Sequence, residues 1–197
     1  VVLSHGFMRS QTQMEDLAGH LGSWGLRVVT PDLCHASMFD TDHAQNGADL
    51  VALAGGLASG GDVLYAGHSA GGLASVIAGS QDSDALGVLG LDPVDNGGLA
   101  AAAAVAAPTY SLVGEPSMCN SNGNFRPILQ GQVTATAFVV NGTQHFDFET
   151  DMCPGFDLAC SFCAPAGGPG NTAIRGLVTA AAVWRAGVDE GGATWWV

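Results

Sequence analysis

The segment DVLYAGHSAGG, residues 62–72, decides how the rest of the chain is interpreted. Its first half is a short apolar run typical of a buried strand, and an apolar stretch rich in small residues follows it to about Gly79. Between the two, residues 67–71 match the pattern G-x-S-x-G, in which a serine occupies a sharp turn from a strand into a helix. Glycines suit the flanking positions because a β-carbon there would collide with the neighbouring strand or helix. The segment therefore predicts that Ser69 is a nucleophile on a strained turn; without that strand and helix, the same pentapeptide indicates an ordinary glycine turn.

Strand and helix patterns alternate along the chain on both sides of this segment, which is typical of a parallel sheet covered by helices. The expected strands cover residues 1–4, 26–30, 62–66, 86–91, 108–113 and 134–140. The expected helices cover residues 11–24, 46–59, 70–79 and 171–186, and the alanine-rich run 99–107 fits a helix or a loop. Because 197 residues are enough for one buried core, we expect a single α/β domain over residues 1–197, with about six strands and helices on both faces of the sheet.

The nucleophile needs a base to accept its proton, and that base lies near it in space rather than in sequence. His68 precedes Ser69, but we expect its side chain to point away from the hydroxyl and to pack under the turn. His145 follows the last expected strand, in a loop that can carry it over the sheet edge, and it keeps the order serine, acid, histidine. We therefore expect His145 to be the general base. The remaining loop and helix histidines are expected to be structural or solvated: His20, His35 and His43.

A carboxylate must fix the tautomer of the base and stabilise its cation. Asp92 is the preferred candidate because it ends an expected strand and Pro93 makes the following turn rigid. Asp95 after the same strand and Glu115 after the next one remain open as alternatives.

The developing oxyanion needs two backbone N–H groups. Ala70 supplies one as the residue after the nucleophile, and the loop His5-Gly6-Phe7 after the first strand offers the Phe7 N–H as the other. We expect substrate contacts from Met8 and Phe146, on loops at the same end of the sheet. Other apolar residues there fit either a substrate pocket or the core equally well: Phe7, Met38, Phe39 and Phe148.

Composition excludes two classes of partner. The chain has 18 acidic residues against five arginines, no lysine, and a formal net charge of −13, which repels nucleic-acid phosphates and anionic lipids. The longest apolar run, near residues 99–108, is about half of the roughly 20 residues that a membrane helix needs. We expect no nucleic-acid partner, no membrane span and a monomer. The chemistry proposed for Ser69 requires neither a metal nor an organic cofactor.

Five cysteines favour disulfides over a metal site, since Cys160 and Cys163 form the only short pair and no histidine pair accompanies them. We expect at least one bridge within the group from Cys119 to Cys163. A Cys119–Cys153 bridge would pin the loop that carries His145, whereas Cys153–Cys160 and Cys119–Cys163 remain open. Cys34 is the expected odd residue. Disulfides favour an extracellular or periplasmic location.

With these residues in view, the chain resembles the chlorophyllases and their bacterial relatives within the α/β hydrolases. The resembling segments are VLSHGF at 2–7, VVTPDL at 28–33, GHSAGG at 67–72 and LGLDPVD at 89–95. The resemblance implies an α/β-hydrolase fold without the two strands that normally precede the first one here. It also favours Asp92, because the similar platelet-activating-factor acetylhydrolases place their acid after the corresponding strand. Chlorophyllases usually carry a large or basic residue where Ala70 stands, which leaves the substrate open. The Cys119–Cys153 arrangement resembles one in some aromatic-polyester hydrolases.

Together these features predict a serine esterase that works through an acyl-enzyme. Chlorophyllase-like cleavage, short-chain ester hydrolysis and polyester hydrolysis use the same triad, so the motif does not separate them. The alternatives are a lipid esterase similar to lipases or platelet-activating-factor acetylhydrolases, and a catalytically inactive binding module on the same fold.

Overall fold

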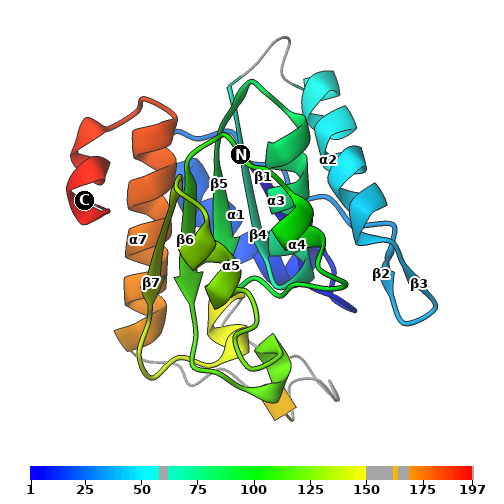
Figure 1. Cartoon of the computed structure of the whole chain (residues 1–197). Helices are drawn as coiled ribbons and strands as arrows, with labels where there is room; N and C mark the ends of the chain where they lie inside the picture. The colour runs from blue at the N-terminus through cyan, green and yellow to red at the C-terminus, as the bar shows by residue number, and fades with distance from the viewer. Residues whose placement is uncertain (58–61, 150–161, 164–168, 197) are drawn as a thin grey trace.

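A parallel sheet of five strands, in the order β1-β4-β5-β6-β7, forms the centre of the molecule (Figure 1). The computed structural model describes residues 1–57, 62–149, 162–163 and 169–196. The strands of the sheet are β1 (Val2–Ser4), β4 (Val63–His68), β5 (Ala85–Leu91), β6 (Thr109–Val113) and β7 (Ala135–Val139). Every neighbouring pair in this sheet is parallel, which confirms the expected α/β architecture.

The expected strand at residues 26–30 is the main correction to the sheet, which has five strands rather than about six. Val29 forms only an isolated parallel bridge to Val2, with its N–H donating to Val1 O at 2.9 Å and its carbonyl accepting from Leu3 N at 2.9 Å. Pro31 follows two residues later and has no N–H with which to extend a ladder. A small antiparallel hairpin, β2 (Ala36–Ser37) with β3 (Asp40–Thr41), comes next and was not expected from the sequence.

Helices cover both faces of the sheet (Figure 1). Their bounds are α1 (Glu15–Ser23), α2 (His43–Leu57), α3 (Ala70–Gln81), α4 (Leu99–Ala102), α5 (Arg126–Gly131) and α7 (Pro169–Arg185). Short 3-10 segments are η1 (Gln11–Met14), η2 (Met118–Asn120), η3 (His145–Phe148) and η4 (Glu190–Trp195).

Local capping explains where two of these helices begin. Helix α2 starts at His43 rather than at the expected residue 46, because the Asp42 carboxylate accepts the Gln45 N–H at 2.9 Å. In the alanine-rich run only α4 is helical, and Asp95 accepts the N–H groups of Gly98 at 3.1 Å and Ala100 at 2.9 Å at its start.

Alternating side chains on the strands produce the two halves of the core. On β4, Leu64 and Ala66 pack in one cluster with residues of α1 and α7, whereas Val63 and Tyr65 pack with residues of α2 and α3 on the other face. Both faces are therefore buried, as expected for a parallel sheet. No helix in the described ranges combines the length and the apolar character that crossing a bilayer requires.

The parallel sheet brings together residues that are far apart in the chain. Strands β4, β5 and β6 end in register, with His68 opposite Leu91 and Leu91 opposite Leu112. The residues directly after two of these ends are Ser69 and Asp92, whose N–H groups donate to Leu91 O at 3.0 Å and Leu112 O at 2.7 Å. The carboxyl ends of parallel strands are where such folds place their sites, and the loop after β7 carries His145 to the same edge.

We expect Gly71→Ala to lower the free energy of unfolding by about 1–3 kcal/mol, the usual range for overpacking. A β-carbon at residue 71 would collide with the His5 carbonyl and lie 2.6 Å from Ser4 O, and backbone atoms cannot move aside cheaply. The matched control is Gly19→Ala on the exposed side of α1, where a β-carbon has no neighbour within 4 Å. That change should stabilise the protein by about 0.5–1 kcal/mol. Urea denaturation measures both, and equal stabilities of Gly71→Ala and the wild type would contradict the close approach.

Candidate active site

Ser69 occupies a strained backbone conformation between β4 and α3. Its φ is 54° and its ψ is −120°, a combination that non-glycine residues rarely adopt. Backbone hydrogen bonds hold it there, since its carbonyl accepts from Leu73 N and from Val94 N, both at 3.2 Å. The turn is also crowded, because a β-carbon at Gly72 would lie 2.8 Å from Pro93 Cβ. The G-x-S-x-G segment thus forms the strand-turn-helix that the sequence predicted.

A buried histidine–carboxylate pair lies at the same edge of the sheet. His145 Nδ1 is 2.7 Å from Asp92 Oδ2, and the two side chains are 4% and 0% exposed. The carboxylate accepts the Nδ1 proton, so the lone pair of the neutral ring stands on Nε2. Of the three candidate acids, Asp92 is the one paired with His145. Asp95 caps α4 instead, and Glu115 Oε1 accepts the Gly142 N–H at 3.2 Å.

His68 joins the loop that carries His145 to the turn that carries Ser69. The two imidazole rings are 4.4 Å apart between centroids, and His68 Nε2 donates to the His145 carbonyl at 3.0 Å. His68 is completely buried, as expected for a side chain beneath the turn. Within the described chain no hydrogen bond joins the Ser69 hydroxyl to His145.

A buried ionic network, which the sequence did not reveal, supports His68 from behind. Glu149 Oε1 lies 2.9 Å from His68 Nδ1, and Glu149 Oε2 lies 2.8 Å from Arg9 Nη2. Burial has the largest effect on Glu149 and acts to raise its pKa, but His68 and Arg9 together outweigh it and hold this pKa below its ordinary value of 4.5. Nothing in the sequence distinguishes Arg9 or Glu149 from solvated charges, because their burial depends on contacts 140 residues apart.

The pKa of His145 lies below its ordinary value of 6.5. Burial is the main cause, and the neighbouring His68 adds to it, while the hydrogen bond to Asp92 and the charges of Asp92 and Glu149 oppose them. The ring is therefore neutral at neutral pH and can accept a proton.

A cleft of about 600 Å³ opens at Ser69. Phe7 and Ala70, the two expected oxyanion donors, line it together with Ser69. The Ala70 N–H begins α3, where the first four N–H groups have no partner inside a helix. The loop of Phe7 passes close to the nucleophile, because a β-carbon on Gly6 would lie 3.2 Å from Ser69 Cβ. The structure thus brings both expected donors to the nucleophile.

The other walls of the cleft come from several loop segments, of which sequence reasoning had connected only the one that carries Met38 with a pocket. They include the β2–β3 hairpin, the first residue of α2, and the turns before α4 and after η2. The lining residues from these segments are Met38, Thr41, His43, Val94, Asp95, Asn96, Gly97, Cys119 and Ser121. His43, expected to be structural or solvated, is 6% exposed and lines the cleft.

The two residues expected to contact substrate lie elsewhere. Met8 is 54% exposed and is not among the residues that line the cleft. Phe146 is buried, with its ring centroid 5.8 Å from that of His145 and the Arg9 guanidinium over its face. Phe148 is part of the core. A larger hollow of about 670 Å³ lies between α1, α7 and η4 and includes none of Ser69, Asp92 and His145.

Comparison with known proteins identifies the fold. The chain is similar to the crystal structure of a candidate hydrolase of the α/β superfamily from Xanthomonas campestris pv. campestris, with a TM-score of 0.59 and 18% identity over 71% of this chain and 84% of that one. The chain has the α/β-hydrolase fold. No family model and no curated protein matches it. At this identity the reaction must be argued from the site itself.

A disulfide lies beside the cleft of this α/β-hydrolase fold, at the η2 turn. Cys119 is bonded to Cys163, with 5.8 Å between their Cα atoms, which confirms a bridge in the expected group. Of the two pairings that the sequence left open for Cys119, the one with Cys163 is formed and the one with Cys153 is not; Cys153 and Cys160 lie outside the described residues. Cys34 is exposed and free, as expected. Among the described residues no three His, Cys, Asp or Glu side chains are grouped to hold a metal ion.

We expect thiol titration of the denatured, unreduced protein to find no more than three free thiols per chain, since the bridge removes two of the five cysteines. Titration after reduction is the control and should find all five. Mass spectrometry of a proteolytic digest should recover the Cys119 and Cys163 peptides linked to each other. Five free thiols before reduction would contradict the bridge.

Proposed function

We propose that this α/β-hydrolase-fold protein is a serine carboxylic-ester hydrolase with Ser69 as nucleophile, His145 as general base and Asp92 as the acid that orients it. The observation that carries the proposal is the buried 2.7 Å pairing of His145 with Asp92. The loop that carries His145 is held by a hydrogen bond from His68, the residue that precedes the strained serine. A base, an orienting carboxylate and a serine on such a turn are the components that acyl transfer requires.

The first step transfers the acyl group to Ser69. The Ser69 Oγ forms a bond to the ester carbonyl carbon while His145 Nε2 takes the hydroxyl proton. The negative charge that develops on the carbonyl oxygen is stabilised by the N–H groups of Phe7 and Ala70. When the tetrahedral intermediate collapses, the bond from carbon to the alcohol oxygen breaks, and the Nε2 proton passes to the leaving alcohol.

The second step returns the enzyme to its starting state. Water attacks the acyl carbon while His145 Nε2 takes one of its protons, and the same two N–H groups stabilise the second oxyanion. Collapse breaks the bond to Ser69 Oγ, which recovers its proton from His145, and the carboxylic acid leaves. Asp92 stays ionised throughout and stabilises the imidazolium that forms in each half-reaction.

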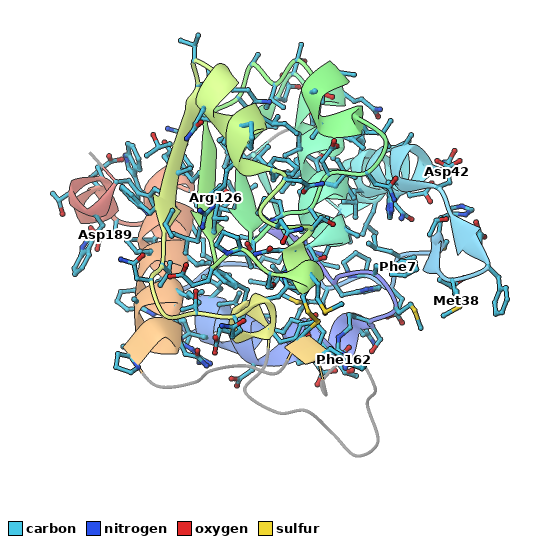
Figure 2. The ribbon with its side chains drawn as sticks, turned by 60° about the horizontal axis from the view of Figure 1, so that its bottom comes forward. Phe7, Met38, Asp42, Arg126, Phe162 and Asp189 are labelled. Carbon is cyan, nitrogen blue, oxygen red and sulfur yellow. A yellow bond between two sulfur atoms is a disulfide. The ribbon has the colours of Figure 1, made fainter. Side chains whose placement is uncertain are left out.

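Uncharged, apolar esters suit the cleft best. Two of its lining residues have exposed large apolar side chains, Phe7 at 38% and Met38 at 65%, and Phe39, next to Met38 in the chain, is 98% exposed. Figure 2 shows Phe7 and Met38 on the same side of the molecule. The net charge of −13 and Asp95 in the lining disfavour anionic substrates. These features support chlorophyllase-like, short-chain or polyester substrates, and a disulfide beside the cleft supports an extracellular or periplasmic location.

We expect a fluorophosphonate probe to label Ser69, and the wild type to hydrolyse p-nitrophenyl acetate or butyrate. Ser69→Ala and His145→Ala should each lower kcat by about 10⁴- to 10⁶-fold, as losses of triad members generally do. Ser80→Ala, on the far end of α3, is the matched control and should retain both labelling and turnover. A folded wild type that neither reacts with the probe nor turns over any acyl length would favour a binding module on the same fold.

The pH dependence of kcat/KM should follow the lowered pKa of His145. Only the neutral ring accepts the Ser69 proton, so activity is full above this pKa and is lost as the pH falls through it. Because burial and His68 shift the pKa downward, we expect the midpoint of the acid limb below 6.5. An uncharged p-nitrophenyl ester keeps substrate titration out of the profile. A midpoint above 6.5 would mean that Asp92 and Glu149 outweigh burial.

A further inference from the structure

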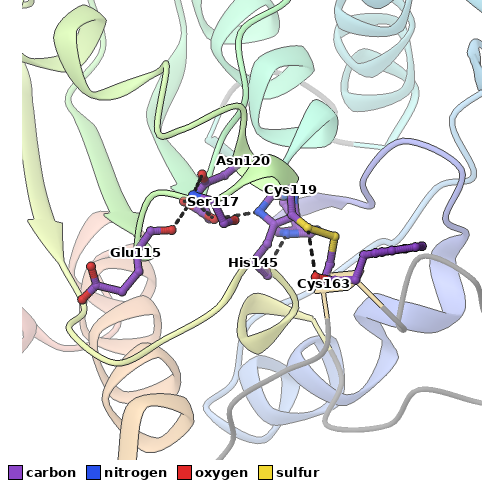
Figure 3. The surroundings of a disulfide bond; sticks show 9 residues. Glu115, Ser117, Cys119, Asn120, His145 and Cys163 are labelled. Carbon is purple, nitrogen blue, oxygen red and sulfur yellow. Dashed lines mark hydrogen bonds and ion pairs between the residues drawn. A yellow bond between two sulfur atoms is a disulfide. The ribbon is translucent and has the colours of Figure 1, made fainter.

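We propose that Asn120 is a positioning residue of this site: its side-chain amide holds the Asp92 carboxylate in the orientation that receives the His145 Nδ1 proton. This inference rests on the proposed esterase function. Asn120 ends the η2 turn and is completely buried, and neither the motifs nor the spacing of the sequence indicated it. Figure 3 shows it between the disulfide and Glu115, close to His145.

The Asp92 carboxylate is held at both oxygens. Asn120 Nδ2 donates to Oδ2 at 3.0 Å and lies 3.3 Å from Oδ1, while the Gly114 N–H donates to Oδ1 at 2.9 Å. Oδ2 is also the oxygen that accepts the His145 proton at 2.7 Å. Rotation of the carboxylate away from His145 would therefore also break its contacts to Asn120 and Gly114.

The orientation of the Asn120 amide is determined by its surroundings. Its Oδ1 accepts the N–H groups of Ser117 at 2.9 Å and Gly123 at 3.0 Å, and an N–H₂ group could bond to neither. Its Nδ2 also donates to the Glu115 carbonyl at 2.9 Å. Because Oδ1 is fixed by two donors, the amide presents Nδ2 to Asp92, and a flipped amide would place two acceptors against each other.

The turn that carries Asn120 is itself strained and tied down. Ser121 and Asn122, which follow it, have φ of 50° and 57°, in the left-handed region that non-glycine residues rarely adopt. Such a conformation persists only where surrounding contacts enforce it, and here the Cys119–Cys163 bridge holds the residue before Asn120. Cys119 and Ser121 both line the cleft of Ser69, so the turn connects the cleft wall to the triad acid.

The test is Asn120→Asp, with Asn122→Asp as its matched control. A carboxylate at position 120 can still accept the Ser117 and Gly123 N–H groups, so the turn keeps its caps, but the atom that faces Asp92 changes from a donor to an acceptor. Residue 122 is exposed in the same turn, so the control adds the same charge without touching Asp92. Circular dichroism and thermal unfolding establish that both variants are folded.

We expect Asn120→Asp to lower kcat by about 10- to 100-fold, by analogy with residues that orient the ligands of metal sites, with KM little changed. Two close buried carboxylates share a proton at acidic pH, which restores a donor to Asp92. The ratio of variant to wild-type kcat should therefore fall as the pH rises. Asn122→Asp should keep the wild-type kcat and pH profile. An unchanged kcat in a folded Asn120→Asp variant, or a rise in KM alone, would overturn the positioning role.

Proton NMR separates this inference from the proposed function, since it needs no turnover. In the wild type, the His145 Nδ1 proton bound to Asp92 should give a low-field resonance that is shifted or lost in Asn120→Asp and kept in Asn122→Asp. If Asn120→Asp does not fold, the wild type still decides: the Asn120 side-chain amide resonances should follow the titration of His145. Asn120 amide resonances that do not shift as His145 titrates would overturn the inference. A His145 Nδ1 proton resonance that is unchanged in Asn120→Asp would do the same, even in an inactive protein.

Discussion

Three backbone segments approach closely around the turn of Ser69: the end of β1, the start of α3 and the turn at Pro93. The rest of the site depends on this constraint. Helix α3 begins so close to β1 that residue 71 has no room for a β-carbon beside Ser4 and His5, and residue 72 has none beside Pro93. This packing holds Ser69 in a conformation that a serine would not keep by itself. It also places the loop of Phe7 beside Ser69, because β1 ends in that loop. One steric condition thus determines both the nucleophile and its expected oxyanion donors.

Around this turn the protein buries more charge than a core normally contains, and each charged group has a partner. Asp92 has His145, Asn120 and Gly114, while Glu149 has Arg9 and His68. Buried charges are tolerated only when they are paired and hydrogen-bonded. Removing one partner leaves the other charge buried with nothing to offset its desolvation penalty. The two groups meet at His145, whose ring bonds to Asp92 and whose carbonyl bonds to His68. Hydrogen bonds at its ring and at its backbone carbonyl consequently hold His145 in place.

The walls of the cleft at Ser69 come largely from short segments outside the central sheet. The β2–β3 hairpin supplies an exposed apolar side chain, and η2 supplies Cys119 of the disulfide together with the following Ser121. Neither segment has a core of its own, so their positions depend on a few contacts, such as the hydrogen bond from Met8 N to Ala36 O at 2.7 Å. Loops of this kind vary without disturbing the sheet, which is why the fold does not determine the substrate.

The sequence by itself determined the α/β architecture and indicated Ser69 and His145 as residues of the proposed site. Alternating strand and helix patterns predicted the parallel sheet, and the G-x-S-x-G segment identified Ser69, because both signals are local and depend on residues within one or two elements. The order of serine, acid and histidine narrowed the acid to three residues. It could not choose among them with certainty, since the choice depends on where the loop after β7 ends.

Only the tertiary structure decided which carboxylate meets His145, that Arg9 and Glu149 are buried partners, that Asn120 supports Asp92, and that Cys119 is bonded to Cys163. It also reduced the expected strand at 26–30 to a single bridge and placed Phe146 in the packing beneath the base rather than in the cleft. The physical reason is the same in each case. These outcomes depend on contacts between residues 27 to 140 positions apart, and the one-dimensional pattern of a lone sequence does not contain their distances.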